Sequence, residues 1–295
     1  MIWGPGEWFS LASALVWAVS VLLFKKSGES VAPVALNVFK NALVLPLFAL
    51  TYFAFHGLTA PTLPAGAAAL ALLSGALGIG LGDSLYFRAL NAIGASRMGV
   101  AQMLYSPSVI LLSALLLGER LSAHQIGGVA LVLIGIALVN VAPQLQALDR
   151  QRIRAGLAYA GASMFAMALG VVLAKPLLER YDFLTLVVLR IAAGLLGLLI
   201  YVAARREAAV LMSAFRRVRH WPAVIAGSIG GTYLSMMLWL AGYKYTSASI
   251  AAVLNEMASV FLIALAALLL REHLKPRQLG GAALALAGVL LVLWR

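Results

Sequence analysis

Cysteine is absent from the 295-residue sequence, and charged residues are scarce. Without cysteine there can be no disulfide framework, iron–sulfur site or thiol nucleophile. Charged residues make up 11% of the chain, whereas soluble proteins average about 25%. The four histidines, His56, His124, His220 and His273, lie at the ends of apolar runs. We therefore expect neither a metal site nor a cofactor, and the composition is not that of a soluble enzyme.

What the sequence does contain is hydrophobic residues, which make up 63% of the chain. Ten apolar runs are each long enough to approach the roughly 20 residues that a membrane-spanning helix needs. Each run is expected to be a helix, because backbone polar groups in hydrocarbon must be satisfied within the segment. The predicted spans are 8–24, 33–55, 66–91, 95–117, 122–141, 155–175, 182–203, 222–243, 247–270 and 276–294. The predicted fold class is therefore an all-α integral membrane protein with ten transmembrane helices.

The chain repeats itself. The stretch Ala95–Val139 recurs 153 residues later, and the first two spans recur at an offset of 150. Matched pairs include Ala95 with Ala248, Glu119 with Glu272, Gly128 with Gly281, Ser13 with Ser163, and Lys40 with Arg190. We predict two five-helix repeats, 1–141 and 155–295, joined by a polar linker over 142–154. Because five is odd, the second repeat must be inverted, which places a polar cavity between the halves.

Several short motifs resemble a known family. They are Gly82-Asp83, Arg88-Ala89-Leu90, Gly94-Ala95-Ser96-Arg97, Pro107 within the fourth span, Leu117-Gly118-Glu119-Arg120-Leu121, and the later echoes Thr246-Ser247-Ala248-Ser249 and Arg271-Glu272. The order of these motifs and their duplication resemble the pattern of the EamA-type branch of the drug/metabolite transporter superfamily. The resemblance covers nearly the whole chain. It implies a ten-helix carrier of small metabolites, often an exporter, and leaves the substrate open.

Charge distribution suggests an orientation in a bacterial-type inner membrane. Most Lys and Arg residues follow the odd-numbered spans, which by the positive-inside rule places both termini outside. The family resemblance instead implies termini inside. The net charge of +12 lies at span ends, where membrane lipids account for it, so we expect no nucleic-acid partner. The basic segment 204–221 fits either an interfacial helix or a solvated loop. Met1 to Glu7 hold no Lys or Arg, so no cleaved signal peptide is expected.

Polar groups inside the spans are the candidate site residues, because a charge at a helix centre costs about 2.5–3.5 kcal/mol on insertion scales. Glu256 lies deepest, and Asn255 precedes it. The equivalent of Asn255 in the first repeat is Gln102, and Tyr105 follows three residues later. We predict substrate binding at these four residues, with Glu256 as the first candidate for proton coupling. The alternative is that Glu256 forms a permanent ion pair that holds the halves together.

Asp83 is the second candidate for substrate binding and proton coupling, with Tyr86 on the same side of its helix. An equally strong alternative is that Asp83 neutralises Lys40 or Arg190. Both cations lie about eight residues into equivalent spans, and snorkelling to the interface is the expected behaviour for them. The mid-span aromatics Trp17, Tyr233 and Trp239 are further substrate-contact candidates. Glu119 and Glu272 end helices and are expected to be structural.

The predicted function is a secondary transporter that exports small amphipathic metabolites, such as amino acids, by alternating access. Its partners would be the small-molecule substrate and membrane lipids. The sequence leaves open whether the protein is a monomer or a dimer. A lipid flippase of the same superfamily is a rival, with Arg88 or Lys40 as the phosphate-binding residue. A GxGD-type intramembrane aspartyl protease is a distant third: Gly80 to Asp83 match that motif, but its partner pair Tyr181-Asp182 follows rather than precedes it.

Overall fold

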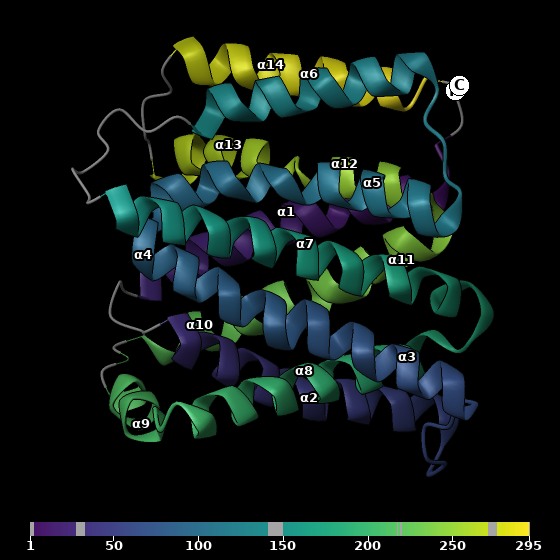
Figure 1. Cartoon of the computed structure of the whole chain (residues 1–295), viewed down its shortest axis with the longest axis vertical. Helices are drawn as coiled ribbons and strands as arrows, with labels where there is room; N and C mark the ends of the chain where they lie inside the picture. Colours follow the sequence, from purple (N-terminus) through teal and green to yellow (C-terminus); the bar gives the residue numbers. More distant parts are fainter. Residues whose placement is uncertain are drawn as a thin grey trace.

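The structure is a computed structural model that describes residues 3–27, 33–140, 150–216, 218, 220–270 and 276–294. Within these ranges all regular structure is helical, and the helices form one bundle (Figure 1). The first half contains α1 (Pro5–Ser27), α2 (Pro33–His56), α3 (Ala65–Gly75), η1 (Ala76–Gly82), α4 (Asp83–Ala101), η2 (Gln102–Leu104), α5 (Tyr105–Leu117) and α6 (Ala123–Asn140).

The second half follows a similar order, with the additional short helix α9 and with two helices, α11 and α12, where the first half has α4. It contains α7 (Arg150–Arg180), α8 (Phe183–Ala204), α9 (Ala208–Arg216), α10 (Trp221–Ser228), η3 (Ile229–Leu234), α11 (Ser235–Tyr245), α12 (Ala248–Asn255), α13 (Ala258–Leu270) and α14 (Pro276–Val292). Residues 142–149 of the predicted linker lie outside the described residues, whereas residues 150–154 belong to α7. Helix α9 forms within the basic segment for which an interfacial helix was one of two expectations.

Six segments are long and apolar enough to cross a membrane. They are Pro5–Leu23, Val34–His56, Ala65–Leu90, Arg150–Arg180, Phe183–Ala204 and Trp221–Tyr245. Four shorter apolar helices are Gln102–Leu117, Ala123–Val139, Ala248–Leu262 and Pro276–Val292. Large apolar side chains such as Leu115 and Leu268 face outward, as expected for a protein whose outer surface meets lipid. The chain is thus an all-helical membrane protein.

Two π-helical segments, η1 and η3, interrupt the third and eighth predicted spans. They begin at Ala76 and Ile229, which are 153 residues apart. Segment η1 is rich in glycine, and its backbone approaches two other helices closely: a Cβ at Gly80 would lie 3.5 Å from Gly197 Cα, and one at Gly78 would lie 3.8 Å from Gly170 Cα. Small residues at both sides of a contact let helix backbones approach this closely. The π-helical turns were not predicted from the sequence.

Each half makes the same kind of contact with the other half. Helix α1 packs on α10, η3 and α11, and helix α7 packs on α3, η1 and α4. Ser13 Oγ of α1 donates to Ser235 O over 2.9 Å, and Ser163 Oγ of α7 donates to Gly82 O over 2.7 Å. Ser13 and Ser163 are equivalent residues of the two repeats, as are Gly82 and Ser235. Each bond therefore has a counterpart in which the two halves have swapped roles.

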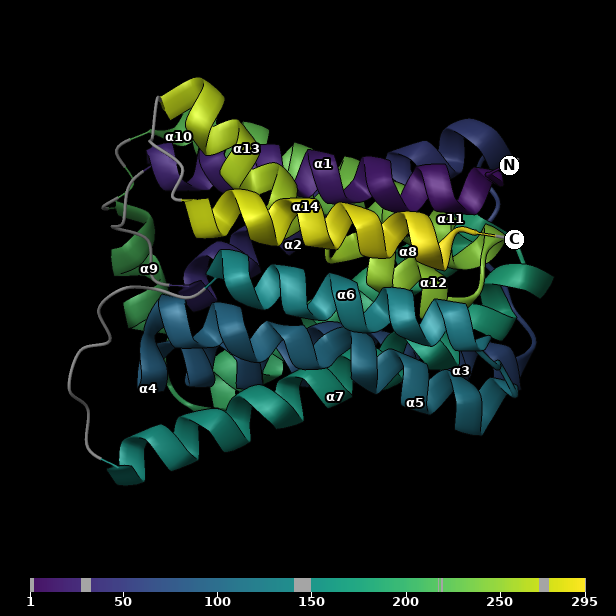
Figure 2. The ribbon, with the colours of Figure 1, turned by 90° about the horizontal axis from the view of Figure 1, so that it is seen from above.

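Helices α6 and α14 lie side by side along one flank of the bundle (Figures 1 and 2). A Cβ at Gly128 would meet Gly288 O at 2.7 Å, and a Cβ at Gly135 would meet Gly281 O at 2.5 Å. Moving up α6 from 128 to 135 therefore means moving down α14 from 288 to 281, so the two helices are antiparallel. These glycines make the close crossing possible.

Replacing Gly281 by alanine is expected to destabilise this crossing. Its Cβ would lie 2.6 Å from Gly135 O and 3.0 Å from Val139 N, so the helices must separate. Overpacking of this kind typically costs about 1–3 kcal/mol. The adjacent Gly280→Ala is the matched control, because nothing lies within 4 Å of its Cβ position. Thermal unfolding in detergent should show a lower midpoint for Gly281→Ala than for Gly280→Ala; equal midpoints would contradict the close packing.

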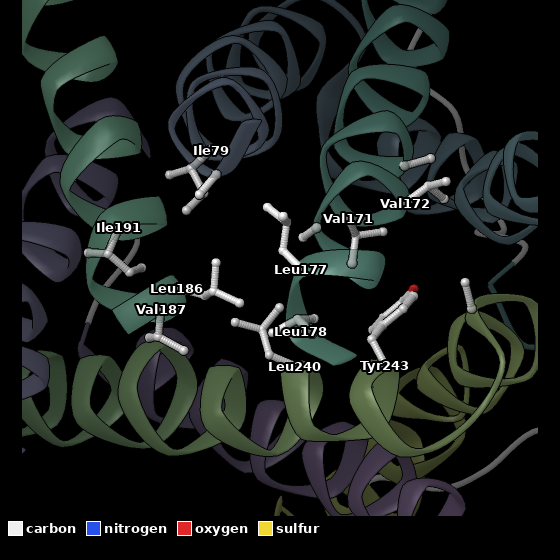
Figure 3. Packing of buried hydrophobic residues seen from close by; sticks show 14 of the residues in the cluster. Ile79, Val171, Val172, Leu177, Leu178, Leu186, Val187, Ile191, Leu240 and Tyr243 are labelled. Carbon is white, nitrogen blue, oxygen red and sulfur yellow. The ribbon is translucent and has the colours of Figure 1, made fainter. Parts of the chain in front are cut away.

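The largest buried apolar cluster lies between α7, α8, α11 and η1. Figure 3 shows Leu177 and Leu178 of α7 facing Leu186 of α8 and Leu240 of α11. At its edge Tyr243 is buried completely, with its hydroxyl at the boundary of the apolar side chains. This cluster fixes the positions of α8 and α11, from which two of the site residues project.

Candidate substrate-binding site

Both repeats have a helix break at the same position. In the first, the 3₁₀ segment η2 starts at Gln102; in the second, a turn at Glu256 and Met257 separates α12 from α13. At this turn, hydrogen bonds between residues three apart replace the α-helical bonds between residues four apart. In one of them Glu256 N–H donates to Val253 O over 3.2 Å. Interrupted helices in membranes expose backbone groups that often form ligand sites. The break places the Glu256 side chain between the halves.

Glu256 of the second half is held by a side chain of the first half. Ser106 Oγ donates to Glu256 Oε1 over 2.7 Å, and it also lies 3.2 Å from Ala252 O. The carboxylate is half-buried, and among the described residues neither Lys nor Arg lies within ion-pair distance of it. A permanent ion pair was the alternative to a functional role, and the described part of the structure gives that alternative no partner.

Two tyrosines form a hydroxyl pair near Glu256. The hydroxyls of Tyr105 and Tyr243 are 2.9 Å apart, and both lie within electrostatic range of Glu256. Trp239 packs edge-on against Tyr243, with ring centroids 5.1 Å apart. The structure therefore brings the predicted residues Tyr105, Trp239 and Glu256 together. It does so through Tyr243, which the sequence analysis did not select.

Arg190 is the cation at the other side of the tyrosine pair. The expectation that it snorkels to the interface is wrong, because only 2% of its surface is exposed. Its Nη1 donates to Gly170 O over 2.9 Å, and both tyrosine hydroxyls are within its electrostatic range. We call Tyr105, Ser106, Arg190, Tyr243 and Glu256 the central polar cluster; it is made by α5, α8, α11 and the α12–α13 break.

A second group surrounds Asp83 at the start of α4. Asn37 Nδ2 donates to Asp83 Oδ2 over 2.9 Å, and Asn41 Nδ2 donates back to Asn37 Oδ1 over 3.0 Å. Lys40 interacts electrostatically with Asp83, and its Nζ lies 6.0 Å from the centre of the Trp17 ring. We call these five residues the Asp83 cluster. Of the two cations considered as partners of Asp83, Lys40 is therefore the one it faces.

The other predicted site residues lie apart from the central polar cluster. Gln102 is exposed, and Asn255 Nδ2 donates to Ala251 O of its own helix over 2.7 Å. The Tyr233 hydroxyl lies 2.5 Å from Thr51 Oγ1. Tyr86 packs on a small apolar cluster around α4 and the first part of α7. Arg88, named for the flippase alternative, lies 5.3 Å from the centre of the Tyr201 ring on α8.

One end of the bundle, which we call the Glu119 end, is closed by contacts between the halves. Glu119, just after α5, accepts hydrogen bonds from Ala248 N at 2.7 Å, from Ser249 N at 3.0 Å and from Ser249 Oγ at 2.8 Å. It thereby caps the N-terminus of α12, where a negative charge is favoured by the helix dipole. Glu119 was expected to be structural, and its partner is a helix of the other half; its equivalent Glu272 lies outside the described residues.

Lys175 completes the Glu119 end from the second half. Its Nζ donates to Glu179 Oε1 at 2.7 Å and to the carbonyls of Tyr243 and Thr246, each at 2.9 Å. An open pocket of about 520 Å³ lies beside these contacts and is lined by Glu119, Lys175, Glu179, Lys244, Tyr245, Thr246, Ser247 and Ile250. Lys175 therefore ties α7 to the end of α11, directly behind Tyr243 of the central polar cluster.

Asp182 lies at the same end of the bundle and does not meet Asp83. It caps α8 by accepting from Thr185 N over 2.7 Å, and His56 Nε2 lies 3.2 Å from Oδ1. Burial raises the pKa of Asp182, but the hydrogen bond from Thr185 and the neighbouring His56 outweigh burial and hold the pKa below its usual value. An aspartyl protease needs two acids that share one site. With Asp83 on Asn37 and Asp182 on His56, this pair is not formed.

Two halves with matching helix breaks around a buried polar cluster, in an all-helical membrane protein, indicate a membrane transporter. Comparison with known families identifies which one: the chain belongs to the EamA-like transporter family, whose profile matches twice, over residues 4–141 and 154–294. This places it among membrane transporters of the drug/metabolite superfamily, as the sequence motifs indicated.

Individual relatives agree with this assignment. An uncharacterized transporter of Archaeoglobus fulgidus is 24% identical over 289 residues, which cover 96% of each chain. An uncharacterized protein of Pseudomonas aeruginosa is 36% identical over 140 residues, which cover 48% of this chain and 47% of that one. A crystal structure of a protein with 17% sequence identity superposes with a TM-score of 0.78 over 98% of this chain and 96% of the other, which shows that the fold is shared.

Proposed function

We propose that this protein is a secondary transporter that exports small amphipathic metabolites, such as amino acids, across a bacterial-type inner membrane by alternating access. One observation carries the proposal: the Ser106–Glu256 hydrogen bond joins a hydroxyl of the first half to a carboxylate at a helix break in the second. Ionisable residues inside a membrane protein mark substrate or ion pathways by default. A site shared by two halves is released or formed when the halves move against each other.

The proposal includes an inverted repeat of two five-helix units, 1–141 and 155–295. The six long apolar segments and the four shorter apolar helices would together make ten spans. Two observations support inversion. The Ser13–Ser235 and Ser163–Gly82 bonds are exchanged between equivalent helices, and α6 runs antiparallel to its counterpart α14. Both features are expected of a pseudo-two-fold axis in the membrane plane.

Orientation follows from the charge count, which favours both termini outside, against the family resemblance. Helices α5 and α14 end, and α12 begins, at the same side of the bundle (Figure 2). The Glu119 end would then face outward and be closed, leaving the site to communicate with the cytoplasm. A reporter fused after Arg295 that is active only in the cytoplasm would reverse this assignment.

The function is tested by counterflow in vesicles that contain the purified protein. Vesicles preloaded with an unlabelled amino acid, a nucleoside or a cationic drug are diluted into medium with the labelled compound. We expect transient accumulation of at least one amino acid in protein-containing vesicles and none in protein-free vesicles. The absence of counterflow for all three classes would contradict the proposal.

A further inference from the structure

The end of the bundle opposite the Glu119 end is strongly basic. There α7 and α14 begin, α8 ends and α9 lies (Figures 1 and 2), and we call it the arginine end. Among the described residues of that end Glu207 is the one acid, whereas the exposed bases are Arg150, Arg152, Arg154, Arg205, Arg206, Arg216 and Arg277. The described charges of the Glu119 end are balanced, with Glu7, Glu119, Glu179 and Asp182 beside Arg120, Lys175, Arg180 and Lys244.

Helix α9 has one side against the bundle and one side that faces away from it. Leu211 packs against the largest apolar cluster, and Ala214 is buried. Met212 and Arg216 lie four residues apart, on the same side of the helix, and both are exposed. An exposed apolar side chain beside a base is typical of a helix that lies in a membrane interface. Trp221 follows at the start of α10, and tryptophan is enriched at that depth.

The turn between α8 and α9 holds an arginine where glycine is the usual residue. Arg206 has a φ of 55°, in the left-handed region, and it is the one non-glycine residue with a positive φ in the described part of the chain. Arg206 N donates to Ala203 O and Glu207 N donates to Val202 O, each over 3.0 Å, so this turn closes α8 as a glycine would. The conformation is less favourable for arginine than for glycine. Backbone strain of this kind is found where a side chain has a task.

The basic surface continues onto the side of the bundle. Arg205 Nε lies 3.8 Å from Glu207 Oε1. Arg88 of α4, beside the Tyr201 ring, is also within electrostatic range of Glu207. Glu207 therefore faces two arginines and offsets one positive charge, and Arg206 next to it adds another. The surface keeps an excess of positive charge that an anion from outside the protein can neutralise.

We propose that the arginine end binds anionic phospholipids, with Arg205, Arg206 and Arg216 holding headgroup phosphates and the exposed side of α9 lying where headgroups meet acyl chains. Guanidinium groups bind phosphate oxygens with paired hydrogen bonds. A free phosphate ion would meet only the charges, whereas a lipid also covers Met212. The lipid is a bound partner rather than a transported substrate. The inference goes beyond the proposed transport function and holds for either orientation in the membrane.

The test uses the purified full chain in a neutral detergent, with dioleoylphosphatidylglycerol, dioleoylphosphatidylcholine and inorganic phosphate as probes. The apparent affinity for each probe is obtained from the rise of the thermal unfolding midpoint with probe concentration. A base near an anionic surface strengthens binding about fivefold. We expect phosphatidylglycerol to act at a concentration at least 10-fold lower than phosphatidylcholine. This preference should shrink at about 1 M salt, where the Debye length is only about 3 Å.

Two double variants locate the lipid site. Arg205→Gln with Arg216→Gln should lower the apparent affinity for phosphatidylglycerol about 10- to 30-fold, because two bases are lost from the arginine end. Arg120→Gln with Arg180→Gln is the matched control, since it removes two exposed arginines from the balanced Glu119 end. The control should keep the wild-type affinity for both lipids.

Arg206→Gly separates lipid binding from folding. Glycine adopts the left-handed conformation at no steric cost, so the unfolding midpoint without lipid should equal or exceed that of the wild type. The affinity for phosphatidylglycerol should nevertheless fall about fivefold. Equal affinities of the wild type for the two lipids, the same loss in both double variants, wild-type affinity in Arg206→Gly, or phosphate as effective as phosphatidylglycerol would each overturn the inference.

Discussion

Replacing Glu256 by glutamine is expected to remove the pH dependence of transport. Glutamine has nearly the same shape and still offers an oxygen to Ser106 Oγ, so the helix break should stay intact. What it cannot do is release or accept a proton. In the wild type a protonated Glu256 cannot pair with a substrate ammonium group, so apparent affinity should fall as the pH falls. In Glu256→Gln the affinity should be low and equal at every pH.

The measurement is counterflow in vesicles between pH 5.5 and 8.5, with substrate affinity determined at each pH. Glu179→Gln is the matched control, since Glu179 is an exposed acid whose loss removes one hydrogen bond from Lys175. It should retain the wild-type pH profile. Asp83→Asn tests the second candidate for proton coupling in the same assay. A Glu256→Gln variant with the wild-type profile would exclude Glu256 as the proton carrier.

Replacing Glu119 by alanine is expected to open the Glu119 end of the bundle. The variant loses three hydrogen bonds to the start of α12, and hydrogen bonds to a charged group contribute about 1.5–3 kcal/mol each. Because 1.4 kcal/mol corresponds to a factor of ten, openings at this end should become at least 10-fold more frequent. Transport should then lose its coupling, since a site open to both sides leaks.

Opening can be followed with a cysteine at Ser113, because the natural chain has no cysteine. Ser113 is buried below Glu119, with its Oγ 2.8 Å from Ser249 Oγ. A hydrophilic maleimide should label Ser113→Cys at least 10-fold faster when Glu119→Ala is also present. Adding Glu179→Ala instead should change the rate little. Equal labelling rates with and without Glu119 would mean that other contacts close this end.

Much of the fold could be predicted from the sequence because bilayer thickness and internal repetition constrain it so strongly. Apolar runs with short polar breaks predicted the helices, and the ends agree within a few residues in most cases, as for α2, α8 and α14. The predicted break between the third and fourth spans at 92–94 is wrong, because α4 continues to Ala101 and the break comes at η2. Two fixed offsets predicted which segments are equivalent. The π-helical turns of η1 and η3 were missed, since residues such as Gly78 and Gly80 suit close packing in any helical geometry.

The candidate site was predictable only in part. Glu256, Tyr105 and Trp239 were selected because polar or aromatic side chains in mid-span are unusual, and the structure brings them together. Tyr243 was counted as a span end, and Arg190 was expected to reach the interface along its flexible stem. The depth of a long side chain depends on how its helix is tilted and covered by neighbours, which one sequence does not specify. A usable signal existed: Lys40 of the first repeat faces Asp83, whereas the position equivalent to Asp83 in the second repeat is Met236.

The central claim is that the halves must move apart at the Glu119 end for transport to occur. The direct test is a disulfide between α5 and α12, made from Ser113→Cys and Ser249→Cys, whose hydroxyl oxygens are 2.8 Å apart in the natural protein. Oxidation should stop counterflow almost completely, and a reductant should restore it, while each single variant remains active. Full counterflow with the disulfide formed would contradict the account.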